Sequence, residues 1–75
     1  MDSKTLNTAD KERRIQAYEA IQRELKCAQT TCKNILMLSR RLPSYTHSGE
    51  RTKIKNMIGE LVELSIAYDE GKNTL

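Results

Sequence analysis

The sequence contains neither tryptophan nor phenylalanine, and tyrosine occurs only three times in 75 residues. Two cysteines are too few for the disulfide framework of a small secreted domain. The N-terminal residues lack the apolar segment of a secretory signal. The longest apolar run, Ile35 to Leu38, is far too short to span a membrane. These absences predict a cytoplasmic chain with reduced thiols and no membrane partner.

The sequence also lacks the motifs of catalytic and metal sites. It has no glycine-rich phosphate loop and no zinc-binding spacing. Cys27 and Cys32 would lie about 140° apart around a helix and about 7.5 Å apart along it, which is unsuitable for a disulfide. His47, the single histidine, is interpreted as a solvated turn residue, because two helices offer no pocket for the orienting acid and oxyanion hole that catalysis requires. We therefore expect no enzymatic activity, no cofactor and no bound metal.

What the sequence does contain is helix-forming character. From Ala9 to Leu42 there is neither glycine nor proline, and strong helix formers are frequent. One long helix is therefore predicted over roughly residues 9–41. Asn7 or Thr8 would cap its start, because both side chains can accept hydrogen bonds from free backbone N–H groups. Its end is expected just before Pro43, which disfavours helical geometry in the residue that precedes it.

A second, shorter helix is predicted over roughly residues 50–70, after a turn at 42–49. Ser48 is the expected N-cap, and Gly71 is expected just past the C-terminal end, where glycine accepts left-handed geometry. The chain then forms one helical domain over residues 1–75, with an ordered core at about 8–71 and flexible tails at 1–7 and 72–75.

Both predicted helices carry apolar residues at alternating spacings of three and four, which is typical of helices that pack along one seam. The row of the first helix comprises Tyr18, Ile21, Leu25, Ala28, Cys32, Ile35, Ser39 and Leu42. The row of the second helix comprises Ile54, Met57, Leu61, Leu64 and Tyr68. The sequence therefore predicts an antiparallel all-α hairpin.

The second helix has more apolar residues than one seam requires. Ile58, Val62 and Ile66 form a further row, and the start of the longer first helix would overhang its partner with Ile15 and Tyr18 exposed. A second copy could cover all of these residues, which predicts a homodimeric four-helix bundle. The alternatives are a three-helix monomer, with a break at the β-branched pair Thr30-Thr31, and a different protein docked on the surplus face.

Charge is unevenly placed along the chain. Residues 33–55 hold six basic residues against one acidic residue, whereas residues 56–75 hold four acidic residues against one basic residue. The candidate binding cluster comprises Arg40, Arg41, Arg51, Lys53 and Lys55. The last three oppose the dipole at the start of the second helix, which suggests a binding role. We also expect Tyr45 to fold back over the end of the bundle.

The leading hypothesis from these features is a small non-enzymatic regulator or inhibitor that docks on a larger protein. Single-purpose chains of this size are common among factors encoded by phages and mobile elements. The alternative is a helical hairpin that binds nucleic acid through its basic cluster, by contacts with phosphates rather than bases. A weaker alternative is an assembly factor or co-chaperone. The process and the partner are not identified by any motif.

Overall fold

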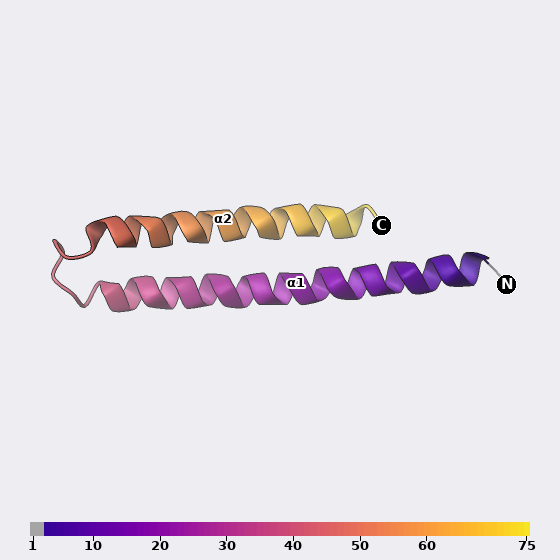
Figure 1. Ribbon diagram of the computed structural model, residues 1–75, viewed down its shortest axis with the longest axis horizontal. Helices are drawn as coiled ribbons and strands as arrows, with labels where there is room; N and C mark the ends of the chain where they lie inside the picture. The colour runs from indigo at the N-terminus through magenta and orange to yellow at the C-terminus, as the bar shows by residue number, and fades with distance from the viewer. Residues whose placement is uncertain (1–2) are drawn as a thin grey trace.

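The computed structural model describes the backbone of residues 3–75 and the side chains from residue 8 onward. The described chain forms two antiparallel helices, α1 (Ser3–Ser39) and α2 (Ser48–Asn73), joined by a turn (Figure 1). The Cα atoms span 66 × 15 × 12 Å, so the molecule is a narrow rod. The predicted all-α hairpin is confirmed.

Helix α1 is continuous through Thr30 and Thr31, so the three-helix alternative is wrong. Both threonines are exposed, and each costs only about 0.5 kcal/mol in a helix, which is too little to break it. The helix begins at Ser3 rather than near residue 9. Asn7 and Thr8 therefore lie inside it, because a capping residue favours a helix start without preventing an earlier one. The expected flexibility of the tails stays a prediction, and residues 1–2 lie outside the described part.

The turn falls at residues 40–47, two residues earlier than expected. Helix α1 ends at Ser39, and the amide of Leu42 then donates to the Ser39 carbonyl at 3.2 Å. His47, not Ser48, precedes the first residue of α2 and adopts the left-handed conformation, with φ 51° and ψ 34°. Pro43 lies between the helices, as predicted.

Gly71 does not end α2, which continues to Asn73 with Thr74 as its C-cap. The reason for glycine at this position is tertiary. A Cβ atom built on Gly71 would lie 2.8 Å from the hydroxyl oxygen of Tyr18 and 3.0 Å from its Cε1. Glycine therefore allows the tyrosine of α1 to approach the backbone of α2 closely.

The seam between the helices differs from the predicted rows at every second position of α2. Ile58 and Ser65 are half-buried in the seam, whereas Met57 and Leu64 remain 49% and 45% exposed. In α1, Ile35 is 46% exposed. Helix α2 is therefore rotated about its axis so that Ile58 and Ser65, rather than Met57 and Leu64, face α1.

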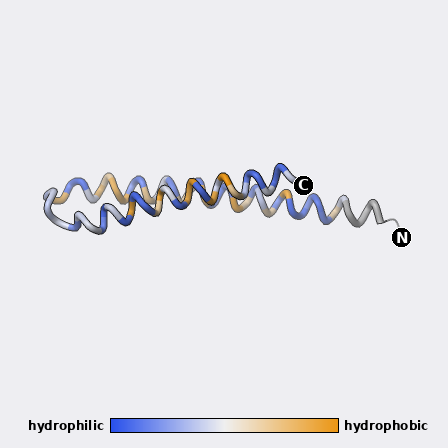
Figure 2. The backbone as a smooth tube through the Cα atoms, turned by 90° about the horizontal axis from the view of Figure 1, so that it is seen from above, coloured by the Kyte–Doolittle hydropathy of each residue, from blue (hydrophilic) through white to orange (hydrophobic). Residues whose placement is uncertain are grey.

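The hydrophobic core is thin. Within the described residues only Cys32 and Leu36 are buried, at 7% and 9% exposure. Figure 2 shows hydrophobic residues at intervals along both helices rather than gathered in one centre. The chain exposes 6116 Å², whereas a compact monomer of 8.6 kDa exposes about 4,700 Å². The isolated hairpin therefore leaves much more surface in water than a globule of its mass.

Candidate docking surfaces

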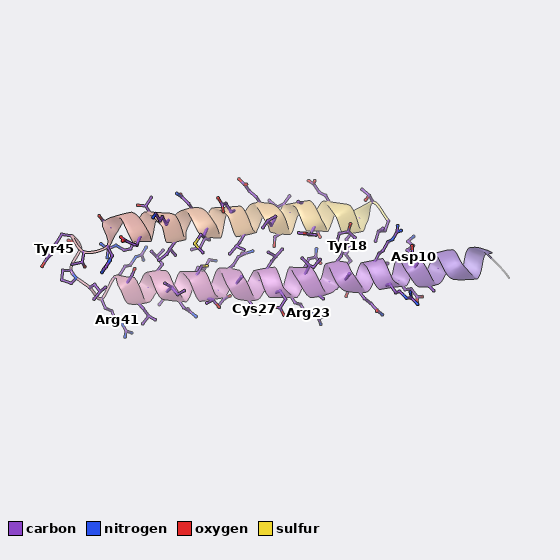
Figure 3. All side chains as sticks on the ribbon, viewed as in Figure 1. Asp10, Tyr18, Arg23, Cys27, Arg41 and Tyr45 are labelled. Carbon is purple, nitrogen blue, oxygen red and sulfur yellow. The ribbon has the colours of Figure 1, made fainter. Side chains whose placement is uncertain are left out.

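The turn carries exposed side chains of two chemical kinds. Arg40 and Arg41 follow the last residue of α1, and both are exposed. Tyr45 is 83% exposed and projects from the tip of the hairpin, so it does not fold back over the helices (Figure 3). Thr46 tightens the turn by donating to the Pro43 carbonyl from its amide at 2.9 Å and from its hydroxyl at 2.6 Å. We call Arg40, Arg41 and Tyr45 the turn-end cluster.

Arg51, which the sequence grouped with these arginines, is used inside the chain. Its guanidinium donates to the carbonyl of Ser39, at 3.2 Å, and to the carbonyl of Ser44. The first acceptor, which also accepts from the amide of Leu42, lies at the C-terminal end of α1, where the helix dipole favours a cation. Arg51 is half-buried and holds the end of α1, the turn and the start of α2 together.

The two lysines of the predicted cluster are separated. Lys53 and Lys55 are both exposed, but they lie on opposite flanks of α2, because two residues turn a helix by about 200°. In the first turn of α2, the carboxylate of Glu50 lies 3.7 Å from Nδ1 of His47. A hydrogen bond from its own backbone N–H, and then the charges of His47 and Lys53, hold the pKa of Glu50 below its usual value. The predicted cluster therefore reduces to its two α1-end arginines.

The residues predicted at a dimer interface are Ile15, Tyr18, Ile58, Val62 and Ile66. Tyr18 packs on its own α2, with its ring 6.1 Å from the ring of Tyr68 in an edge-on arrangement at 61°. The expected overhang that included Tyr18 is therefore wrong, because α2 extends further than predicted. Ile15 and Ile58 are half-buried. Only Val62 and Ile66 remain exposed, at 41% and 55%.

Val62 and Ile66 lie on a side of the hairpin that is otherwise polar. A shallow groove on this side, here called the polar side, is lined by Gln22, Lys26, Gln29, Val62, Ser65, Ile66 and Asp69. Gln22 donates to Asp69 at 3.2 Å, and Gln29 donates to the Ser65 hydroxyl at 3.3 Å. These pairs join the two helices along this side and fix their register.

The opposite side is apolar, although the sequence predicts its residues in the seam. Its residues, here called the apolar side, are Ile21, Ala28 and Ile35 of α1 with Met57 and Leu64 of α2. The register places Ala28 level with Leu64, and Ile35 level with Met57. Within the described residues no side-chain hydrogen bond or ion pair joins the helices here. The signal in the sequence is the spacing of seven within each row. A row in the seam has the same spacing, so spacing alone does not separate the two.

Shallow apolar grooves continue the apolar side toward the open end of the hairpin. One groove is lined by Arg14, Ala17, Tyr18, Ile21, Tyr68 and Leu75, and the next by Ala20, Ile21, Glu24, Leu25 and Ala28. Ile21 is common to both, so the apolar side and these grooves form one continuous strip. Both grooves are open and shallow, which suits an opposing helix better than an enclosed small molecule.

The thiols and acidic groups form no recognisable reactive centre in the part of the chain that the structure describes. Cys27 is exposed on the side of α1 away from α2, and Cys32 is buried, so the two thiols are unpaired (Figure 3). Among residues 8–75 no three histidine, cysteine or acidic side chains gather as a metal site would require.

Comparison with protein families, curated proteins and solved structures finds no match to this chain. None of the described helices is long and apolar enough to cross a membrane.

Proposed function

We propose that this chain is a small non-enzymatic interaction protein, a regulator or inhibitor that docks its turn-end cluster on an acidic surface of a larger protein. The observation that carries the proposal is the contrast among neighbouring arginines. Arg51 is bound to two backbone carbonyls. Within the described residues, by contrast, no hydrogen bond or ion pair engages the side chains of Arg40 and Arg41.

The chemistry of the cluster suits a protein partner. Arginine and tyrosine are the side chains most often found as anchors of protein interfaces, because each buries a large area and offers hydrogen bonds. Tyr45 provides such an anchor at the tip, and two adjacent guanidinium groups would steer it toward carboxylates. We propose that the protein acts as a homodimeric four-helix bundle, so that each dimer presents two copies of the turn-end cluster.

The proposal is tested by capturing binding partners from a lysate with the wild-type chain and with a variant of the turn-end cluster. A double variant, Arg40→Ser and Arg41→Ser, should lose a protein that the wild-type chain retains after nuclease treatment. The matched control is Arg23→Ser, since Arg23 is exposed on the face of α1 away from α2 (Figure 3). Equal capture by the double variant and the wild-type chain would refute docking through the turn end.

A second candidate function is nucleic-acid binding at the same cluster, and the exposure of Tyr45 favours it. An exposed tyrosine beside arginines can stack on an unpaired base while the cations contact phosphates. Nuclease-sensitive capture would support this candidate. The affinity for a single-stranded nucleic acid should fall steeply with salt. We expect a loss of about 0.7 log units per phosphate contact for each tenfold rise in salt concentration. Docking on a protein predicts a weaker salt effect, mainly on the association rate.

A further inference from the structure

We propose that the apolar side, and not the row Ile58, Val62 and Ile66, is covered by a second copy of this chain. The two hairpins would run antiparallel, with their turn ends at opposite ends of the bundle. The inference specifies the dimer of the proposed function but is independent of any docking partner.

The two sides of the hairpin differ in chemistry. The polar side is already occupied by Gln22 with Asp69 and by Gln29 with Ser65, and covering it would remove these polar groups from water. On the apolar side, Ile35, Met57 and Leu64 leave 46%, 49% and 45% of their surface exposed. Covering this side removes hydrocarbon from water and leaves the two polar pairs of the other side exposed.

The area of one side of the hairpin matches that of a dimer interface. The helices run side by side over the 26 residues of α2, about 39 Å, and two helices side by side are about 20 Å wide. One side of the hairpin therefore offers about 780 Å² to a second copy. A stable protein interface buries about 800 Å² on each partner, so one side of this hairpin is sufficient for a dimer.

The distribution of charge favours an antiparallel orientation of the two hairpins. Residues 33–55, around the turn, hold six basic residues and one acidic residue, and residues 56–75 hold four acidic residues and one basic residue. Hairpins packed in parallel would place both basic ends together. An antiparallel arrangement places each basic end beside the acidic end of the other copy. On the edge of the apolar side, it brings Lys53 toward the level of Glu24 of the second copy.

Two glutamate substitutions on one helix test which side is covered. Leu64 and Ile66 are 45% and 55% exposed in the hairpin, but they lie about 160° apart around α2. Leu64→Glu should raise the dimer dissociation constant at least about 100-fold, because two carboxylates would be buried without partners. Ile66→Glu should change it less than about threefold. In α1, Ile35→Glu should likewise weaken the dimer and Met37→Glu should not, so these two substitutions form a second matched pair.

The measurements are sedimentation equilibrium and the dependence of the melting temperature on chain concentration. If Leu64→Glu prevents folding, the milder Leu64→Ala should keep helical content at high concentration and raise the dissociation constant about 10- to 100-fold. A monomeric wild-type chain would overturn the dimer itself. A dimer disrupted by Ile66→Glu but not by Leu64→Glu would overturn only the choice of side. Either result leaves the docking proposal to its own test.

Spin labels at the tip test the orientation. Tyr45→Cys would carry the label in a Cys27→Ser, Cys32→Ala background, after light scattering has shown that this background is still a dimer. In the antiparallel bundle the two labels should lie about 45–50 Å apart, the length of roughly 32 helical residues. Labels within about 25 Å, little more than the width of a bundle, would show parallel hairpins and overturn the arrangement.

Discussion

Replacing Arg51 by methionine should destabilise the turn end of the hairpin, although it removes a cation that opposes the dipole of α2. The variant loses the hydrogen bonds from the guanidinium to the carbonyls of Ser39 and Ser44. Methionine keeps most of the aliphatic length and has good helix propensity, so the change isolates the charged head group.

The magnitude follows from two opposing effects. A hydrogen bond to a charged group contributes about 1.5–3 kcal/mol when it is shielded from water. Arg51 is only half-buried, and its link to Ser44 is exposed, so we expect about 1–2 kcal/mol for the two together. Removing the cation from the first turn of α2 stabilises the helix by about 0.3–1 kcal/mol. The net loss should be about 1 kcal/mol, or roughly 4–8 °C in melting temperature for a domain of this size.

The assay is thermal unfolding followed by circular dichroism, with all variants at one chain concentration, because assembly makes the melting temperature depend on concentration. Lys55→Met is the matched control: it also removes a cation near the start of α2, but Lys55 is exposed and bonds to no carbonyl in the described structure. The control should melt within about 2 °C of the wild-type chain. If both variants melt together, or if Arg51→Met melts higher, the reasoning is refuted and Arg51 returns to the candidate binding cluster.

The remaining predictions concern the glycines, the cysteines and one acid. Gly59→Ala should stabilise the chain by about 0.5–1 kcal/mol, since nothing lies within 4 Å of the new methyl group, whereas Gly71→Ala should lose that gain because its methyl group meets a tyrosine ring. In urea titrations, Cys27→Ser should stay within about 0.5 kcal/mol of wild type, and Cys32→Ala should cost about 1–2 kcal/mol; equal effects would contradict their different burial. The lowered pKa of Glu50 should contribute stability above pH 4.5 that is lost as pH falls through the folded-state value. Acid titration of Glu50→Gln should therefore show a smaller loss than wild type, and parallel curves would refute this.

The helical hairpin could be predicted because its determinants are local. Pro43 stops one helix by sterics alone, and the long glycine-free segment before it has no competing structure. The seam of α2 was only half predictable. Ile54 and Leu61 belong to either of two heptad rows, and the choice between Met57 and Ile58 depends on how the helices rotate against each other.

The candidate surfaces were less predictable because they depend on contacts between distant residues. The role of Arg51 requires the carbonyl of Ser39, 12 residues away, and no spacing rule identifies such an acceptor. In the sequence, Gly71 has the pattern of a helix terminator. Its close contact with the ring of Tyr18 exists only in the folded hairpin. The exposure of Tyr45 likewise depends on the path of the turn, which is set by Thr46 and Pro43.

The hairpin geometry also orders the steps of folding. Contacts at the turn join residues close in sequence, such as Arg51 and Ser39 at a separation of 12, whereas Gln22 and Asp69 are separated by 47. Closing the longer loop costs about 1.2 kcal/mol more in chain entropy. We therefore expect the helices to pair first at the turn and then progressively toward the open end. Substitutions at Arg51 should slow folding, and those at Asp69 should mainly accelerate unfolding.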